Sequence, residues 1–212
     1  DGWRIISPVL AKRSFIAVNG SLLAARSALQ YGVSCHLAGG THHSHFDFGS
    51  GFCVFNDLAF TALTLTKTKE VKNILIFDCD VHQGDGTARI LENNDRTFTC
   101  SIHSSKNFPY RKANSDLDIG LEDNMSWFGY KKHLLEGLNK CIERFSPDLV
   151  LYVAGVDIHA NDKLGRLSID DEGLFEREMT VLNFFKKRDI PIATVMGAVS
   201  YTHLRAHETG IN

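Results

Sequence analysis

The sequence predicts a three-layer α/β/α fold with a mostly parallel sheet, on the strength of three observations. Segments with the features of strands and of helices alternate along the 212 residues. The segments 71–80 and 96–103 have the continuous apolar character of strands that are buried on both faces of a parallel sheet. No linker, internal repeat or low-complexity tract divides the chain. One open sheet with helices on both faces is therefore expected, with ligands at the carboxyl ends of its strands.

The individual elements are predicted from apolar spacing and from the residues that end each segment. Apolar residues at helical spacing predict a helix over 21–32, which Gly32 ends, and a short strand over 33–40 follows it. Further helices are predicted at 55–69, 126–145 and 170–189. Further strands are predicted at 71–80, 96–103, 147–157 and 190–196. The last helix is expected to have one apolar face behind an acidic first turn, formed by Phe175, Met179, Leu182 and Phe185.

Composition and charge argue against several classes of function. The formal net charge is −2, so the chain as a whole offers no basic footprint for a phosphate backbone or an anionic membrane surface. No apolar run reaches the length of a transmembrane helix. The 5 cysteines occur singly, without a CxxC pair, which is typical of buried thiols in a reducing compartment. We therefore expect a cytoplasmic protein without a nucleic-acid or membrane partner.

Three carboxylates and a histidine lie at the end of the predicted strand 71–80 and just beyond it. Asp80 and His82 stand two residues apart, so in an extended backbone their side chains leave on the same side and can share one ion. Asp157 ends another predicted strand of the same sheet and can supply a third ligand. Two Asp and one His suit Zn²⁺, and three protein ligands leave room for water, as in a catalytic site. The alternative is that Asp80 and Asp85 cap the following turn while His82 packs locally.

A glycine-rich loop, "AGGTHHSHFDFGSGFCVFND", contains the adjacent histidines His42 and His43. Such a pair is often only exposed surface, but glycines on both sides allow the backbone to approach a substrate closely. Two imidazoles beside a metal-bound water could divide the general-base and general-acid work of a hydrolysis. Asp78 and Asp85 are the carboxylates that remain to orient them.

Five motifs in this order resemble the zinc-dependent histone deacetylase family, especially its bacterial and class IV-like members. They are "GGTHH", "GFCVFND", "DCDVHQGDG", "SIHSSKNFPY" and "AGVDIHANDKLGRLSID". The resemblance extends from about Arg4 to Gly197 and implies an arginase/deacetylase-like fold. It also implies zinc-dependent hydrolysis of an acyl amide, with acetylated lysine or an acetylated small amine as the substrate.

The resemblance assigns roles to individual residues. The zinc ligands correspond to Asp80, His82 and Asp157. His43 corresponds to the general base, His42 to the second histidine, and Asp78 and Asp85 to their carboxylate partners. A structural potassium ion is implied near Asp78, Asp80, His82, Ser101 and Ile102. The wall of an acyl-lysine tunnel is implied at Gly51, Phe52, Phe108 and Leu164.

The end of the chain departs from the family. Where the family has a tyrosine in a "GGY" turn, this sequence has "MGAVSY". The string "VSYTHLRAHET" resembles the translation of a sequencing-library adapter, which would also convert the family's glycine to Ala198 and place Tyr201 one position too late. We therefore expect a partial catalytic domain over 1–198, a non-native tail over 199–212, and impaired catalysis because a donor to the oxyanion is missing.

Two other functions remain open from the sequence. A ureohydrolase of the arginase type is thought to share the sheet architecture, but it uses two manganese ions and a "DAHxD" ligand pattern, whereas residue 84 is Gly here. The other possibility is a catalytically impaired module that only binds acyl-lysine. Metal counting distinguishes the first of these from a deacetylase, and turnover distinguishes the second.

Overall fold

The computed structural model describes residues 8–197. In these residues, six strands form one sheet in the order β1-β6-β5-β2-β3-β4, and every pair of neighbouring strands is parallel. The strands are β1 (Val33–His36), β2 (Ile74–Asp78), β3 (Thr97–Ser104), β4 (Leu117–Leu121), β5 (Leu149–Val153) and β6 (Ile192–Val195). The helices are α1 (Pro8–Tyr31), α2 (Asp57–Lys67), α3 (Asp85–Leu91), α4 (Trp127–Arg144) and α5 (Asp171–Lys186).

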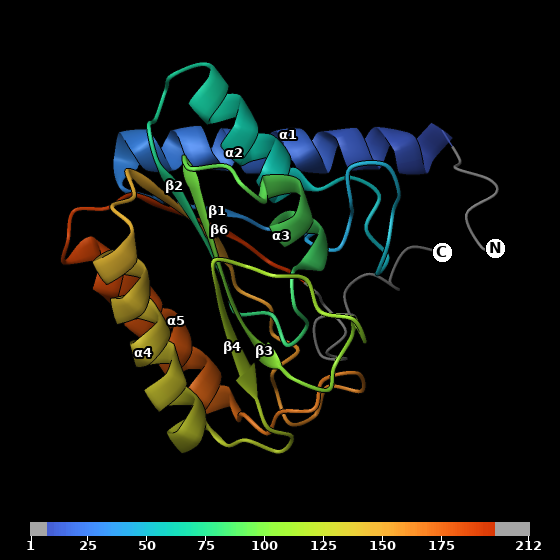
Figure 1. Ribbon diagram of the computed structural model, residues 1–212, viewed down its shortest axis with the longest axis vertical. Helices are drawn as coiled ribbons and strands as arrows, with labels where there is room; N and C mark the ends of the chain where they lie inside the picture. The colour runs from blue at the N-terminus through green and yellow to red at the C-terminus, as the bar shows by residue number, and fades with distance from the viewer. Residues whose placement is uncertain (1–7, 198–212) are drawn as a thin grey trace, which may run out of the picture.

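The helices cover both faces of the sheet (Figure 1). On one face α1 and α2 pack on a core that includes Ala28, Leu65 and Ile76, and α3 lies on this side too. On the other face α4 and α5 pack on a core that includes Leu134 and Phe185. β2 and β5 are buried at every position, because helices cover both of their faces. The predicted three-layer fold is confirmed.

The order of the strands reverses direction beside β2. After β2 the chain adds β3 and β4 on one side, and it then returns to place β5 and β6 on the other. The carboxyl ends of β2 and β5 therefore lie next to each other at a topological switch point, with Asp78 paired to Val153 in the register. In open parallel sheets such a point opens a crevice where ligands bind.

Three local predictions were incomplete. α1 begins at Pro8 rather than at residue 21. The buried residues of α1 all lie from Val18 onward, so residues 8–17 lack the one-sided burial pattern that marks a surface helix. α3 and β4 were not predicted, because α3 has only 7 residues and β4 is an edge strand with alternating exposure.

The predicted apolar face of α5 was wrong in part. Phe175 is 66% exposed and Met179 41% exposed, whereas Gly173, Arg177, Val181 and Phe185 are buried. The true inner face repeats every four residues and includes an arginine, which hydrophobic periodicity counts as a surface residue. Among the cysteines, Cys35 is exposed and the other four are buried free thiols.

Candidate active site

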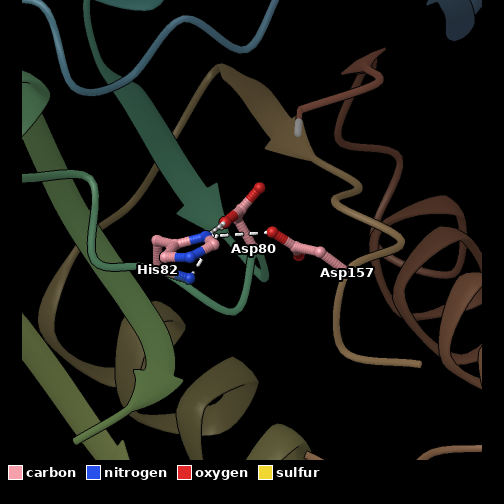
Figure 2. A group of neighbouring side chains, drawn as sticks. All are labelled: Asp80, His82 and Asp157. Carbon is pink, nitrogen blue, oxygen red and sulfur yellow. Dashed lines mark hydrogen bonds and ion pairs between the residues drawn. The ribbon is translucent and has the colours of Figure 1, made fainter. Parts of the chain in front are cut away.

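Asp80, His82 and Asp157 converge at the switch point of the sheet. His82 Nδ1 lies 3.0 Å from Asp80 Oδ1 and 3.0 Å from Asp157 Oδ2. One potential ligand atom from each residue falls within 4.8 Å of the other two, and all three residues are buried. Figure 2 shows the three side chains pointing toward one another, two from the turn after β2 and one from the segment after β5.

Carboxylates shape the turn that carries Asp80 and His82. The backbone is no longer a strand after Asp78, and the N–H of Asp80 donates to Asp78 Oδ1 at 3.0 Å. His82 N–H donates to Asp80 Oδ1 at 2.9 Å, and Val81 N–H donates to Asp157 Oδ1 at 2.9 Å. Asp80 thus holds a backbone amide, as the local-packing alternative supposes, but it does so while it faces His82 and Asp157.

The electrostatics of this cluster fit a divalent cation. Burial, and then the charge of Asp80, raise the pKa of Asp157 to about 7. Burial opposes ionisation of Asp80, but His42 and His82 outweigh it and hold the pKa of Asp80 well below its ordinary value. Burial lowers the pKa of His82. Hydrogen bonds with Asp157 and Asp80 outweigh the effect of burial and raise the pKa of His82 to about 10. Two buried carboxylates this close repel each other when both are ionised, and a bound cation relieves the repulsion. With His82 they form a ligand set that suits Zn²⁺.

His42 and His43 are each held by a carboxylate at Nδ1. His42 Nδ1 lies 2.6 Å from Asp78 Oδ2, and His43 Nδ1 lies 2.7 Å from Asp85 Oδ1. Both histidines are buried, at 1% and 6% exposure, so the alternative of an exposed surface pair is wrong. Asp85 is the first residue of α3, and both of its carboxylate oxygens face histidines of the loop: Oδ1 lies next to His43 Nδ1, and Oδ2 lies 3.2 Å from His45 Nε2. Asp85 therefore serves His43 and not the turn.

The pKa values of the two imidazoles are displaced in opposite directions. Burial lowers the pKa of His42, but the charges of Asp78 and Asp80 outweigh it and raise it to about 9. The pKa of His43 is lowered, first by burial and then by the charge of His42. One ring is thus charged and its neighbour neutral near pH 7, which is the division that acid and base chemistry requires.

The loop with the two histidines is attached to the start of α2 by two residues that we had not predicted. Asn56 caps α2 by accepting from Ala59 N at 2.9 Å, and its Nδ2 donates to the carbonyl oxygens of His42 at 3.3 Å and Ser44 at 3.0 Å. Asp57 accepts from the backbone N–H groups of residues 40 and 41 at 3.0 and 2.7 Å. Both residues end the motif "GFCVFND", and the cap pattern before an apolar run was the available signal.

Glycines allow the loop to lie close to its neighbours. Gly40 has φ +78°, and a Cβ there would stand 2.5 Å from Gly197 Cα. Gly51 has φ +51°, and a Cβ there would collide with the His43 ring. Side chains other than glycine would be strained at both positions.

A pocket of about 760 Å³ opens over the histidines. His42, His43 and His82 contribute to its lining, and the ring of Phe108 stands edge-on to His43 with centroids 4.9 Å apart. The pocket also includes all the residues expected in the substrate wall: Gly51, Phe52, Phe108 and Leu164. Four further residues line the pocket and were not predicted: Lys106, Asn107, Tyr110 and Arg166.

The residues expected around a potassium ion are also close together. Asp78, the last residue of β2, is paired in the register with Ser101 of β3. All five of them are buried: Asp78, Asp80, His82, Ser101 and Ile102.

Ala198 and Tyr201 lie outside the described residues, so the expectations about the tail stay predictions. In the part of the chain that the structure describes, no helix is long and apolar enough to span a membrane.

The molecule is thus an α/β protein with a cluster of buried carboxylates and histidines at the carboxyl edge of a parallel sheet. Residues 3–198 match the histone deacetylase domain family, so the chain belongs to this family. The resemblance seen in the motifs is thereby confirmed.

Several curated proteins are similar to this chain. An uncharacterized protein of Picosynechococcus is 44% identical over 188 residues, covering 89% of this chain and 63% of its own length. Histone deacetylase 2 of Arabidopsis thaliana is 30% identical, with 82% of this chain and 46% of its own length covered. The acetoin utilization protein AcuC of Staphylococcus aureus is 34% identical, with 78% and 46% covered. The chain thus spans about half to two thirds of the length of these relatives.

Solved structures share the fold at low sequence identity. A histone deacetylase homolog from Aquifex aeolicus superposes with a TM-score of 0.77 at 22% identity, covering 92% of this chain and 55% of that chain. Acetylpolyamine aminohydrolase from Burkholderia pseudomallei superposes with a TM-score of 0.76 at 19% identity, covering 91% and 58%.

Proposed function

We propose that this chain is the metal-binding and catalytic part of a zinc-dependent deacetylase that hydrolyses the acyl amide of acetylated lysine or of an acetylated small amine. The observation that carries the proposal is the pair of carboxylate-held histidines with opposite pKa shifts. His42 Nε2 lies 3.8 Å from Asp80 Oδ1, so the pair adjoins the Asp80, His82 and Asp157 cluster. Family membership supports the same reaction class.

The metal would be held by Asp80, His82 and Asp157, whose three side chains leave a position for water or substrate. When bound there, zinc would polarise the substrate carbonyl and lower the pKa of its water to about 7. A potassium ion near Asp78, Asp80, His82, Ser101 and Ile102 remains a proposal that rests on the family resemblance and on the burial of these residues.

The protein groups supply the proton transfers. His43 is neutral by its lowered pKa, and its Nδ1 is held by Asp85, so Nε2 is the nitrogen that can take the proton of the attacking water. Asp78 holds Nδ1 of His42 and, against the effect of burial, raises the pKa of this ring, so His42 can carry a proton and give it to the leaving amine. Gly51, Phe52, Phe108 and Leu164 would enclose the acyl-lysine stem, with apolar surface on most of the wall.

The proteins similar to this chain include a histone deacetylase, an acetoin utilization protein and an acetylpolyamine aminohydrolase. The substrate is therefore best sought among acetyl-lysine peptides and acetylated polyamines. We expect slow turnover by the 212-residue chain, because Tyr201 in "MGAVSY" comes one position later than the family's tyrosine, and loss of one oxyanion donor costs about 10² to 10³ in rate. A cytoplasmic location is proposed from the singly placed cysteines.

The test is zinc-dependent release of acetate from an acetyl-lysine peptide and from an acetylpolyamine, with the Asp157→Asn variant as the control. The proposal expects zinc-dependent acetate release, even if slow, that disappears in the variant. Acetate release that persists after zinc removal, or in the variant, would overturn it. Urea release from arginine with manganese would support the ureohydrolase alternative instead.

A further inference from the structure

Arg177 in α5 is completely buried, although a guanidinium group loses its hydration in the protein interior. It is 0% exposed, and it is the largest of the fully buried side chains among the described residues. Burying a charge is costly unless hydrogen bonds and an opposite charge compensate for it. The partners of Arg177 therefore show which part of the molecule its burial serves.

Those partners lie on the two segments that carry the expected metal ligands. Arg177 Nη1 donates to the carbonyl oxygen of Cys79 at 3.1 Å and to that of Gly155 at 2.7 Å. Cys79 directly precedes Asp80, and Gly155 stands two residues before Asp157. On its other side the guanidinium is paired with Glu178, to which Nε donates at 2.9 Å.

The guanidinium of Arg177 connects these two segments at a point beyond the last hydrogen bonds between β2 and β5. The register between β2 and β5 ends at Asp78 and Val153, and the bond from Cys79 N to Val153 O, at 3.0 Å, follows it. Beyond that point neither segment is a strand, and Nη1 of Arg177 donates to one carbonyl oxygen of each segment. A planar guanidinium with fixed donor directions suits such a bridge better than a flexible ammonium group does.

Gly155 also packs directly against Asp80. A Cβ at residue 155 would stand 2.5 Å from Asp80 Oδ2 and 2.8 Å from Asp80 Cα. The backbone of Gly155 therefore packs against the Asp80 carboxylate without space between them. A shift of the Gly155 carbonyl would displace the Asp80 side chain.

We propose that Arg177 is a positioning residue for the metal centre, which fixes the spacing of Asp80 and Asp157 by bridging the backbones in front of them. The inference rests on the proposed function in that it needs a metal at this cluster. It goes beyond that function by assigning a role to a residue of the helical layer that is not among the expected ligands.

The experiment measures the dissociation constant of Zn²⁺ from the metal-free 212-residue chain by competition with a chelating dye. Arg177→Met keeps the bulk of the side chain and removes the bridge. The matched control is Val181→Ala, on the same buried face of α5 and also 0% exposed, which lowers stability without touching either carbonyl. We expect a roughly 10- to 100-fold higher dissociation constant for Arg177→Met, the usual range for changes to groups that orient metal ligands. Val181→Ala should leave it unchanged.

A second variant and a spectrum cover the case in which Arg177→Met does not fold. Arg177→Lys keeps the charge but not the planar fork, and should weaken Zn²⁺ binding and alter the visible absorption of bound Co²⁺. If Arg177→Lys and every folded Arg177→Met sample match the wild type in affinity and spectrum, the inference is overturned. An equal loss of affinity in Val181→Ala would show a merely structural role and also overturn it. If the wild type binds no Zn²⁺ at all, the metal site itself is overturned, and the inference with it.

Discussion

His43 Nδ1 lies 2.7 Å from Asp85 Oδ1, although the two residues are 42 positions apart in the chain. The other oxygen of the same carboxylate lies 3.2 Å from His45 Nε2. Asp85 therefore connects the start of α3 to the histidine loop and fixes the ring of His43 in one orientation. A base that is oriented in this way keeps its second nitrogen available for the reaction.

Replacing His43 by Ala should abolish most turnover while zinc stays bound. General-base catalysis contributes about 10² to 10⁴ in rate, and His43 is not among the three expected ligands. The measurement is acetate release beside the Zn²⁺ dissociation constant. His133→Ala, at the partly exposed histidine of α4, is the control and should change neither. Undiminished turnover in His43→Ala would remove it from the base role.

Replacing Gly155 by Ala should weaken metal binding. The added Cβ would stand 2.5 Å from Asp80 Oδ2, so the carboxylate must move from its position beside His82. We expect a roughly 10- to 100-fold higher Zn²⁺ dissociation constant. Gly129→Ala, in α4, adds a Cβ that meets the flexible Met125 side chain and should leave binding unchanged. Equal affinities in both variants would show that Asp80 has room to adapt.

Zinc should stabilise the folded chain, and Asp157→Asn should remove this effect. At a free zinc concentration 100 times the dissociation constant, binding adds about 2.7 kcal/mol to the free energy of unfolding. For a domain of this size that corresponds to about 5 to 11 °C in melting temperature. Without zinc, Asp157→Asn should melt no lower than the wild type, because it removes one of two buried carboxylates that repel each other. Thermal melts with and without zinc decide both points, and an equal zinc shift in the variant contradicts the ligand role.

Replacing Asn56 by Asp should disturb the histidine loop but keep α2. The aspartate still accepts from Ala59 N, whereas its second oxygen would face the carbonyl oxygens of His42 and Ser44 in place of a donor. Leaving such buried acceptors unpaired costs about 1 to 3 kcal/mol in the free energy of unfolding, and turnover should fall with it. Urea unfolding, circular dichroism and acetate release measure the three effects. Asn139→Asp, at an exposed position of α4, should behave as the wild type. Wild-type turnover in Asn56→Asp would mean that the loop is held by other contacts.

The fold class and the residues of the candidate site could both be predicted from the amino-acid sequence. Continuous apolar runs around β2 and β3 predicted buried parallel strands, because a strand that is covered on both faces has no polar side to display. The positions of Asp80 and His82 just after one such run predicted where their side chains emerge. Family motifs then supplied roles for these residues and for the two histidines, roles that the experiments above are designed to test.

Which distant residues meet could not be predicted from local sequence patterns. His82 and Asp157 are 75 positions apart, and they face each other because the order of the strands makes β2 and β5 neighbours, which no local pattern encodes. The inner face of α5 was mispredicted for a related reason. Periodicity counts Arg177 as a surface residue, yet two backbone carbonyls and Glu178 compensate for its burial. A charged side chain can therefore be buried wherever the fold supplies partners, and the two carbonyls come within reach of one guanidinium only after the two strands have been brought side by side.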